Sequence, residues 1–340
     1  MRAVVMRRRQ LHIEEVAEPV PGPGQVLVET LACGICGSDL HVLKQAGRLP
    51  ETAPSGDPPL DPDRGVVMGH EFSARVLALG EGASGVAVGD VVVSVPVIAT
   101  AQGIATIGYS PDYPGGYGER MVLTSALCLK VPPELDPRHA ALTEPMAVGR
   151  HAVVRSGIAQ GEAALVLGCG PIGLAVIAAL RLTGIEPVVA ADFSPARRRL
   201  AAELGAGVVV DPREEQAIEA WRRVDGSRSL VIFEAVGVPG MLDEAMQLAP
   251  QKARILVVGA CLEQDSIWPL VGLRKELTIQ FAFGYTPEEF AETLRAMADG
   301  AIGVAPLITG AVGVAGVPEA FASLANPDEH IKILVEPALG

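Results

Sequence analysis

The stretch LVLGCGPIG, residues 165–173, constrains the fold more than any other feature of the sequence. It places Gly168, Gly170 and Gly173 in the spacing GxGxxG, directly after an apolar strand-like segment and directly before an apolar helical one. In that context the first glycine permits a tight turn, the second lets the backbone approach a pyrophosphate, and the third packs helix on strand. The sequence therefore predicts a dinucleotide-binding α/β unit whose helix N-terminus faces the phosphates.

Residues 149–285 continue this pattern, because apolar strand-like segments alternate with helical patterns from ALVLG to LTIQFAF. Such alternation predicts a doubly wound domain, a parallel sheet with helices on both faces. Residues 1–148 differ, since short strand-like segments such as QVLVET and FSARVLALG are separated by Gly and Pro clusters. The tail from residue 286 starts with a helical stretch and ends in the strand-like IKILVEP. The expected fold class is α/β with two domains, one of them mostly β.

Asp192 indicates the cofactor. It ends the next strand-like segment, PVVAAD, and a carboxylate at this place accepts hydrogen bonds from the ribose hydroxyls of NAD and repels the 2′-phosphate of NADP. We therefore expect NAD rather than NADP. The alternative is that Asp192 only caps the helix that begins with SPARRR. Arg197 lies in that helix, either on the adenine side of the pocket or on a solvated face.

The charge balance restricts the kinds of molecule that the chain is expected to bind. With 27 basic and 40 acidic side chains, the formal net charge of −13 disfavours a nucleic acid or an anionic membrane as partner. The membrane-like run 163–180 contains three glycines and a proline, so we interpret it as strand, turn and helix. Five scattered cysteines form no disulfide framework and suit a reducing cytoplasm. We expect a cytoplasmic protein that acts on a small molecule, with no nucleic-acid or membrane partner.

The segment CGICGSDLH, residues 33–41, holds two cysteines, a serine, an aspartate and a histidine. It fits a redox pair, a structural metal knuckle, or a catalytic site in which only one sulfur matters. Cys36, His70, Glu71 and Glu144 are dispersed over more than a hundred residues, roughly as the ligands of catalytic zinc sites are. Taken separately, His70 also fits a buried core histidine, and Glu144 fits a charge at a helix N-terminus.

An ordered set of motifs then places the chain in a family. The set comprises CGICGSDLH, GHEFSARVLALG, VGDVV, GGYGERMVL, LTEPMAVGRHAV, VLGCGPIG, FEAVG and RILVVGAC. It resembles the zinc-dependent medium-chain dehydrogenases, in particular the polyol branch with sorbitol, butanediol and threonine dehydrogenases. The resemblance implies a GroES-like β-rich catalytic domain, residues 1–148 completed by 286–340, and a Rossmann NAD-binding domain, residues 149–285. It also implies reversible hydride transfer between NAD and a secondary alcohol or polyol, in a homodimer or homotetramer.

The resemblance assigns the metal ligands. Cys36 is the zinc thiolate, with Cys33 only a neighbour, and His70 is the imidazole ligand. Glu71 is a ligand or near-ligand, and Glu144 either binds zinc or holds its water. Zinc lowers the pKa of an alcohol that it binds, as it lowers that of water to about 7.

The resemblance also assigns the other site residues. Ser38 receives the proton of the alcohol, His41 passes it outward by way of the nicotinamide ribose, and Asp39 orients a zinc ligand. Further cofactor contacts are expected from Ile172, Val236, Val258, Gly259 and Phe281. For Phe281, Phe283 and Tyr285, packing in the core is the alternative that we favour.

One departure from the family concerns residues 97–116, VIATAQGIATIGYSPDYPGG. Relatives commonly have four cysteines there that bind a structural zinc, whereas this segment has none, so we expect one zinc per chain. The Pro-rich stretch 47–67 predicts a long loop, either functional or a disordered insert. Two rival functions remain at this stage: a zinc-free quinone or enoyl reductase, and a dinucleotide-binding protein without turnover.

Overall fold

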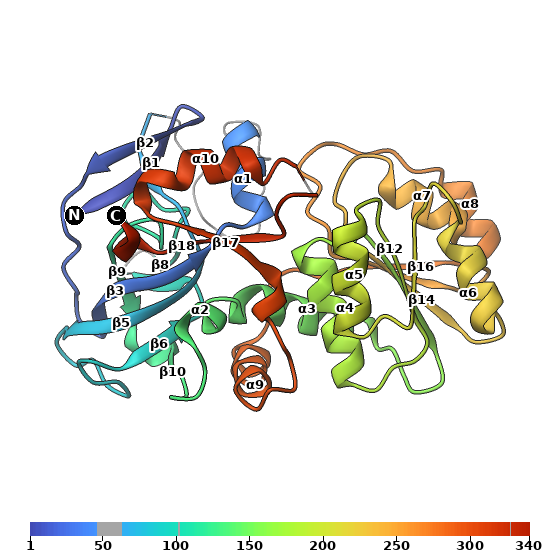
Figure 1. Cartoon of the computed structure of the whole chain (residues 1–340), viewed down its shortest axis with the longest axis horizontal. Helices are drawn as coiled ribbons and strands as arrows, with labels where there is room; N and C mark the ends of the chain where they lie inside the picture. The colour runs from blue at the N-terminus through green and yellow to red at the C-terminus, as the bar shows by residue number, and fades with distance from the viewer. Residues whose placement is uncertain (46–62, 101–102, 327) are drawn as a thin grey trace. The chain divides into compact units, whose positions relative to one another are not determined.

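The computed structural model describes residues 1–45, 63–100, 103–326 and 328–340 (Figure 1). These residues divide into two compact units, one within 1–144, 308–326 and 332–340, the other within 145–307 and 328–331. Residues 286–307, which the sequence analysis assigns to the first domain, therefore fall in the second unit. Most of the predicted loop 47–67 lies outside the described residues.

The first unit is built mainly from strands. Its elements are β1 (Arg2–Arg7), β2 (Gln10–Glu15), β3 (Gln25–Gly34), α1 (Gly37–Gln45), β4 (Val66–Val67), β5 (Glu71–Leu79), β6 (Val91–Ser94), β7 (Val97–Thr100), β8 (Gly103–Thr106), β9 (Arg120–Thr124), β10 (Cys128–Lys130), α2 (Pro137–Ala140), β17 (Ile308–Val312), α10 (Val317–Ser323) and β18 (Lys332–Val335).

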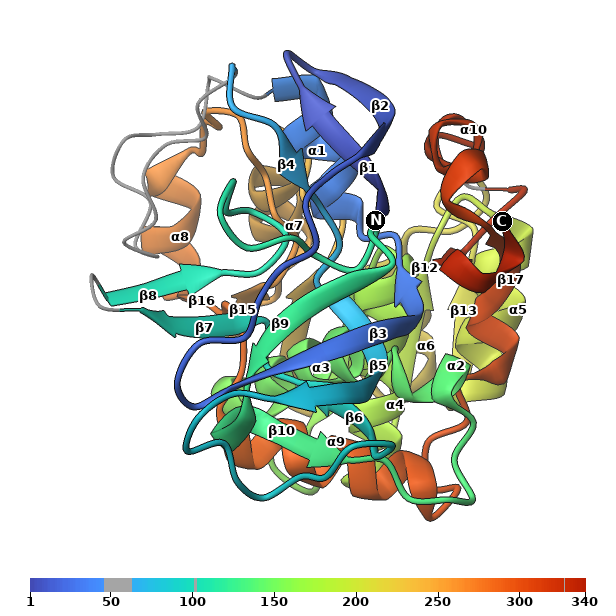
Figure 2. The ribbon, with the colours of Figure 1, turned by 90° about the vertical axis from the view of Figure 1, so that its left-hand side faces the viewer.

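A seven-stranded sheet in the order β10-β6-β5-β3-β18-β17, with β9 also paired to β3, carries the functional side chains of this unit. Figure 2 shows β3, β5 and β6 side by side, and β7 with β8 as a hairpin. β3 and β5 run antiparallel with Gly34 opposite Glu71. This pairing brings the segment that follows β3 next to the segment that precedes β5. The C-terminal strand β18 pairs with the other edge of β3, with Leu334 opposite Gly34.

The second unit is a doubly wound α/β domain. Its elements are α3 (Thr143–Ser156, which begins two residues before the boundary), β11 (Ala163–Leu167), α4 (Pro171–Leu182), β12 (Val188–Ala191), α5 (Pro195–Leu204), β13 (Val208–Val210), α6 (Ala217–Asp225), β14 (Leu230–Glu234), α7 (Met241–Leu248), β15 (Arg254–Val257), α8 (Pro269–Lys275), β16 (Thr278–Phe281) and α9 (Pro287–Ala298).

All six strands of this unit are parallel, in the order β13-β12-β11-β14-β15-β16. The central strands read as continuous apolar runs because helices cover both faces, and every residue of β11 and β14 is buried. The membrane-like run 163–180 is divided between β11 and α4, as predicted. Among the described residues, no helix is long and apolar enough to cross a membrane.

Helix α9 explains why residues 286–307 join the second unit. Thr286 and Glu289 form a capping box that fixes its start. Glu289 also lies 2.8 Å from Nδ1 of His151, and Glu292 pairs with Arg150, both on α3. These polar contacts hold α9 on a helix of the second unit.

Candidate active site and dinucleotide site

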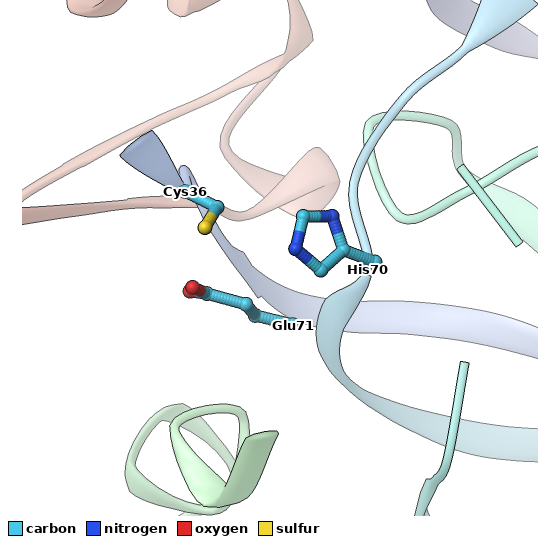
Figure 3. Close-up of side chains that lie close together, drawn as sticks. All are labelled: Cys36, His70 and Glu71. Carbon is cyan, nitrogen blue, oxygen red and sulfur yellow. The ribbon is translucent and has the colours of Figure 1, made fainter. Parts of the chain in front are cut away.

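Cys36, His70 and Glu71 come together in the first unit. Cys36 lies between β3 and α1, His70 directly precedes β5, and Glu71 is the first residue of β5. Each offers one ligand atom, and these atoms all lie within 4.8 Å of one another. Figure 3 shows the three side chains pointing toward one another. Their proximity follows from the pairing of β3 with β5, since the chain leaves β3 just where it enters β5.

The donor set fits a zinc ion. A sulfur, an imidazole nitrogen and a carboxylate oxygen are the three ligand types that zinc uses in proteins. Nδ1 of His70 lies 3.5 Å from the Asp39 carboxylate, which leaves the other ring nitrogen to face Cys36 and Glu71 (Figure 3). At metal sites a ligating histidine usually has a carboxylate next to the ring nitrogen that does not bind the metal, because the carboxylate fixes the tautomer and the ring orientation.

Asp39 is fully buried and accepts hydrogen bonds on both oxygens. Oδ2 accepts from the Cys36 amide at 3.2 Å and from the Tyr117 hydroxyl at 2.6 Å, and Oδ1 accepts from the Tyr109 hydroxyl at 3.1 Å. Burial raises the pKa of Asp39, but the charge of His70 and the hydrogen bonds from Tyr117 and the Cys36 amide outweigh it and lower the pKa. Burial conversely lowers the pKa of His70, and the Asp39 charge raises it well above its ordinary value.

Ser38 and His41 lie one helical turn apart on α1, both half-buried. The Ser38 hydroxyl is 2.9 Å from that of Tyr109. Cys33, in contrast, is fully buried at the end of β3, and its sulfur donates weakly to the Gly34 carbonyl at 3.7 Å. Burial raises the pKa of the Cys33 thiol well above its usual range. A buried thiol with a raised pKa is a poor source of thiolate, which argues against Cys33 as a metal ligand.

Glu71 has a partner, Lys332, that no sequence motif indicates. Lys332, the first residue of β18, donates to both Glu71 oxygens at 2.9 and 2.7 Å and to the Ile35 carbonyl at 3.0 Å. Both side chains are 1% exposed. Burial lowers the pKa of Lys332, but the Glu71 charge, with smaller contributions from Cys36 and Glu144, raises it above the ordinary value. Lys332 is therefore a buried cation that balances the carboxylate.

Glu144 is the second residue of α3 and is half-buried. It is not part of the group formed by Cys36, His70 and Glu71, although its charge acts on Lys332. The structure thus brings three of the four predicted metal ligands together and leaves the fourth carboxylate outside that group.

The GxGxxG turn has the geometry that its sequence predicts. Gly168 has a φ of +88°, and a Cβ there would lie 2.7 Å from Val236. A Cβ on Gly173 would lie 1.9 Å from the Gly168 carbonyl oxygen, so only glycine fits. Gly170 is the N-cap of α4, followed by Pro171 and the half-buried Ile172. The free amides at the start of α4 are suited to a phosphate.

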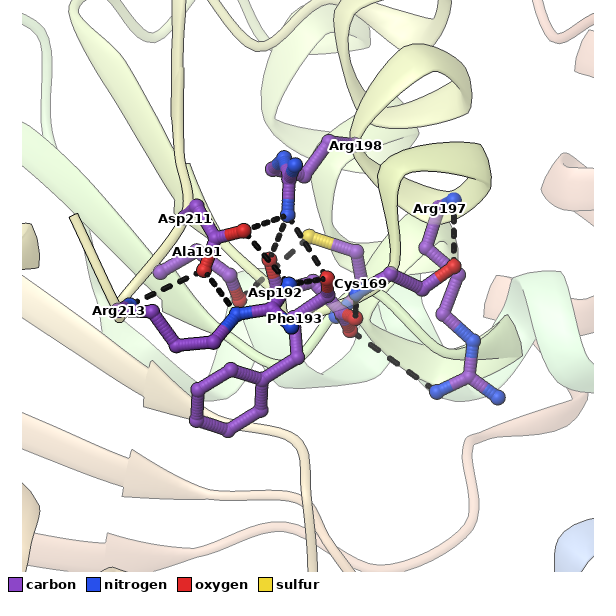
Figure 4. A network of polar contacts seen from close by, with 9 residues as sticks. Cys169, Ala191, Asp192, Phe193, Arg197, Arg198, Asp211 and Arg213 are labelled. Atoms are coloured by element: carbon purple, nitrogen blue, oxygen red, sulfur yellow. Dashed lines mark hydrogen bonds and ion pairs between the residues drawn. The ribbon is translucent and has the colours of Figure 1, made fainter. Parts of the chain in front are cut away.

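Asp192 follows β12 and organises the neighbouring turns. Its carboxylate accepts from the Cys169 amide at 2.7 Å and from the Ser194 amide at 2.8 Å. The N-cap of α5 is Ser194, whose hydroxyl accepts from the Arg197 amide at 3.4 Å. Capping α5 is therefore not the role of Asp192. The Arg197 guanidinium lies 3.9 Å from the Asp192 carboxylate (Figure 4).

Two further arginines near Asp192 already have partners. Arg198 and Arg213 both pair with Asp211, at 3.0 and 2.6 Å, and each donates to the Phe193 carbonyl (Figure 4). The Arg213 guanidinium also lies 5.5 Å from the centre of the Phe193 ring. Their charges are thus largely committed to Asp211 and to the backbone.

The buried Glu234 orders the turns after β14 and β15. Its carboxylate accepts from the Val236 amide at 2.7 Å, and its carbonyl accepts from the amides of Val258 and Gly259 at 2.8 and 2.9 Å. Val236 is 38% exposed.

Phe281 and Phe283 are 65% and 90% exposed, so the favoured interpretation that they pack in the core is wrong for these two residues. Phe281 is the last residue of the edge strand β16, and Phe283 lies two residues beyond it. Tyr285 is half-buried and stacks on the buried Phe290.

Comparisons with known proteins identify the family. The family model described as alcohol dehydrogenase GroES-like domain matches residues 22–133, and that described as zinc-binding dehydrogenase matches residues 171–299. The chain is 35% identical over 351 residues to (R,R)-butanediol dehydrogenase of Bacillus subtilis, with 97% of each chain covered. It belongs to the zinc-dependent medium-chain alcohol and polyol dehydrogenases.

Two further matches agree. This dehydrogenase is 31% identical over 312 residues to L-threonine 3-dehydrogenase of Pyrococcus horikoshii, covering 87% of this chain and 86% of the other. The crystal structure of 2R,3R-butanediol dehydrogenase from Bacillus subtilis superimposes with a TM-score of 0.86 at 34% identity and 99% coverage of both chains. The predicted GroES-like and Rossmann folds are confirmed. So is the prediction of an enzyme that acts on CH–OH donors with zinc and a nicotinamide cofactor.

Proposed function

We propose that this dehydrogenase reversibly oxidises one secondary hydroxyl of a small vicinal diol or polyol to a ketone, with NAD as acceptor. The observation that carries the proposal is the convergence of Cys36, His70 and Glu71, with Ser38 two residues after Cys36, in a chain that resembles a butanediol dehydrogenase over almost its full length. A β-hydroxy amino acid is a second candidate substrate, because the chain is also similar to a threonine dehydrogenase.

The three clustered residues are the proposed ligands of one zinc ion per chain. When bound, zinc supplies a positive charge that lowers the pKa of the substrate hydroxyl. Cys36 contributes the thiolate and His70 the nitrogen that does not face Asp39. Glu71 contributes a carboxylate oxygen while Lys332 balances its charge. Glu144 lies outside the group of Cys36, His70 and Glu71 and is proposed either to bind the zinc as a further ligand or to hold its water.

Ser38 is the proposed proton acceptor. Its half-buried hydroxyl lies at the start of α1, two residues beyond Cys36. A hydroxyl is a weak base by itself, so it needs a group to which the proton moves on. His41, one turn later on the same helix, is assigned that role by way of the nicotinamide ribose.

NAD is the proposed cofactor in preference to NADP. The turn that joins β11 to α4 holds the pyrophosphate against Gly168, Gly170 and Gly173. The Asp192 carboxylate accepts hydrogen bonds from the ribose hydroxyls and repels a 2′-phosphate. The ion pairs of Arg198 and Arg213 with Asp211 support this choice, since they leave these guanidinium groups less available to a 2′-phosphate.

A homodimer or homotetramer is proposed, with β16 at the interface. β16 is the last strand of its sheet, and the residues around it expose large apolar side chains: Trp268, Leu273, Phe281 and Phe283. Exposed apolar groups beside an edge strand favour association with a second copy. Phe283→Glu is expected to lower the mass measured by light scattering, and an unchanged mass would argue against this interface.

A cytoplasmic location is proposed because all five cysteines are free.

A substrate screen tests the proposed function. Purified enzyme with zinc and NAD is offered vicinal diols, sugar alcohols, β-hydroxy amino acids and cyclic alcohols, and NADH is read at its absorbance band. We expect the highest kcat/KM with a small vicinal diol. Absence of NADH with every alcohol would reject turnover, and a higher kcat/KM with a β-hydroxy amino acid would favour the second candidate.

A further inference from the structure

The segment 97–116, which has no cysteines, sends one side chain into the site. In this segment β7 and β8 pair antiparallel, and Tyr109 lies in the turn that follows β8. The Tyr109 amide donates to the Thr106 carbonyl at 3.2 Å. The Tyr109 ring lies 5.3 Å from that of His70, centre to centre. Its hydroxyl contacts both Ser38, at 2.9 Å, and the Asp39 carboxylate, at 3.1 Å. Tyr109 therefore connects Ser38, the proposed proton acceptor, with Asp39, the carboxylate next to Nδ1 of His70.

The hydrogens available decide which group donates and which accepts in each of these contacts. A tyrosine hydroxyl has one hydrogen to donate, and an ionised carboxylate can only accept. Tyr109 gives its hydrogen to Asp39, whose other contacts, from Tyr117 and from the Cys36 amide, are also with donors. Tyr109 must then accept from Ser38. Before the proton moves, the Ser38 hydrogen is held by Tyr109, and the lone pairs of the Ser38 oxygen are left to accept from the substrate. When Ser38 takes the alcohol proton, its own hydrogen must leave Tyr109 for the ribose and His41.

We propose that Tyr109 is a positioning residue that fixes Ser38 as a hydrogen-bond acceptor toward the substrate. The inference rests on the proposed role of Ser38. An alcohol carries a hydrogen that Ser38 can accept, whereas the carbonyl of a ketone offers only lone pairs and needs a donor. Tyr109 therefore favours binding of the alcohol over binding of the ketone, without touching either.

Tyr109→Phe tests the inference, because it removes the acceptor and keeps the ring beside His70. The kinetic constants are measured with the most active alcohol of the screen and with the ketone formed from it. We expect the KM of the alcohol to rise and the product-inhibition constant of the ketone to fall, each by about 2- to 10-fold, the effect of about one net hydrogen bond. Zinc content and NAD affinity stay at wild-type values.

Two controls separate positioning from a structural effect. Tyr113→Phe removes a hydroxyl from the same segment and should change neither constant. In a Ser38→Ala background, Tyr109→Phe should also change neither, because the group that it orients is gone. Opposite shifts that vanish in that background support the inference. Unchanged constants, shifts in the same direction, shifts that persist without Ser38, or loss of zinc would overturn it.

Failure of the proposed function gives a different result. A wild-type enzyme that forms no NADH from any alcohol, or a Ser38→Ala enzyme with wild-type kcat, rejects the proton acceptor and the inference with it. An active wild type that depends on Ser38, together with unchanged constants in Tyr109→Phe, rejects the role of Tyr109 alone.

Discussion

Lys332→Met should destabilise the metal-depleted protein by far more than an ordinary surface substitution. The change keeps the length and apolar stem of the side chain but removes the ammonium that donates to both oxygens of Glu71 and to the Ile35 carbonyl. Glu71 is then a buried carboxylate without a cation, at 1% exposure. Breaking a buried pair in this way costs about 3–5 kcal/mol.

The expected fall in melting temperature follows from that cost. For a domain of this size, about 2–4 °C is lost per kcal/mol, so the first unit should melt about 6–20 °C lower. Differential scanning calorimetry after chelation measures it. Lys130→Met is the matched control, since Lys130 pairs with Asp90 at the surface and is 55% exposed. Its loss should stay below about 1 kcal/mol.

Two further measurements identify the cause. Adding Glu71→Gln to Lys332→Met removes the uncompensated charge and should restore most of the lost stability. The folded pKa of Lys332 is raised above its ordinary value of 10.5, so its contribution is fully present below pH 10.5 and is lost as the pH rises through the higher folded pKa. The stability that Lys332 contributes to the wild-type protein should therefore stay constant from pH 7 to about pH 9. A fall no larger than that of Lys130→Met would refute the reasoning.

Two other predictions concern cofactor and chemistry. Wild type should prefer NAD over NADP by at least about tenfold in kcat/KM, which corresponds to about 1.4 kcal/mol of discrimination, and a preference for NADP would remove the role given to Asp192. Ser38→Ala should lower kcat by about 10²- to 10⁴-fold, the usual contribution of a general acid or base, while the NAD dissociation constant measured by fluorescence titration stays the same. Wild-type kcat at neutral pH in this variant would reject Ser38 as the proton acceptor.

The dinucleotide site could be predicted from the sequence because the residues that indicate it lie close together in the chain. Gly168, Gly170 and Gly173 lie within six residues, and their spacing between an apolar strand-like segment and an apolar helical one predicts a turn and a helix start. Cys36, His70 and Glu71 carry no such local pattern. Their proximity depends on the pairing of β3 with β5, so resemblance to a family was needed to connect them.

Lys332 and Tyr109 could not be predicted for the same physical reason. Lys332 stands in the apolar strand IKILVEP, where a lysine signals burial only if its partner is known, and that partner is 261 residues earlier in the chain. Tyr109 lies in a segment without regular periodicity. The core assignment of Phe281 and Phe283 failed because an apolar pattern does not distinguish a covered strand from an edge strand.

Zinc analysis of cysteine variants tests the central claim most directly, namely that Cys36, His70 and Glu71 form the zinc site. Metal content per chain is measured by elemental analysis for wild type, Cys36→Ser and Cys33→Ser, with NAD binding as the check on folding. We predict about one zinc per chain in wild type and in Cys33→Ser. Cys36→Ser should lose most of the metal and nearly all activity while it still binds NAD. Two zinc ions per wild-type chain, or equal loss in both variants, would contradict the account.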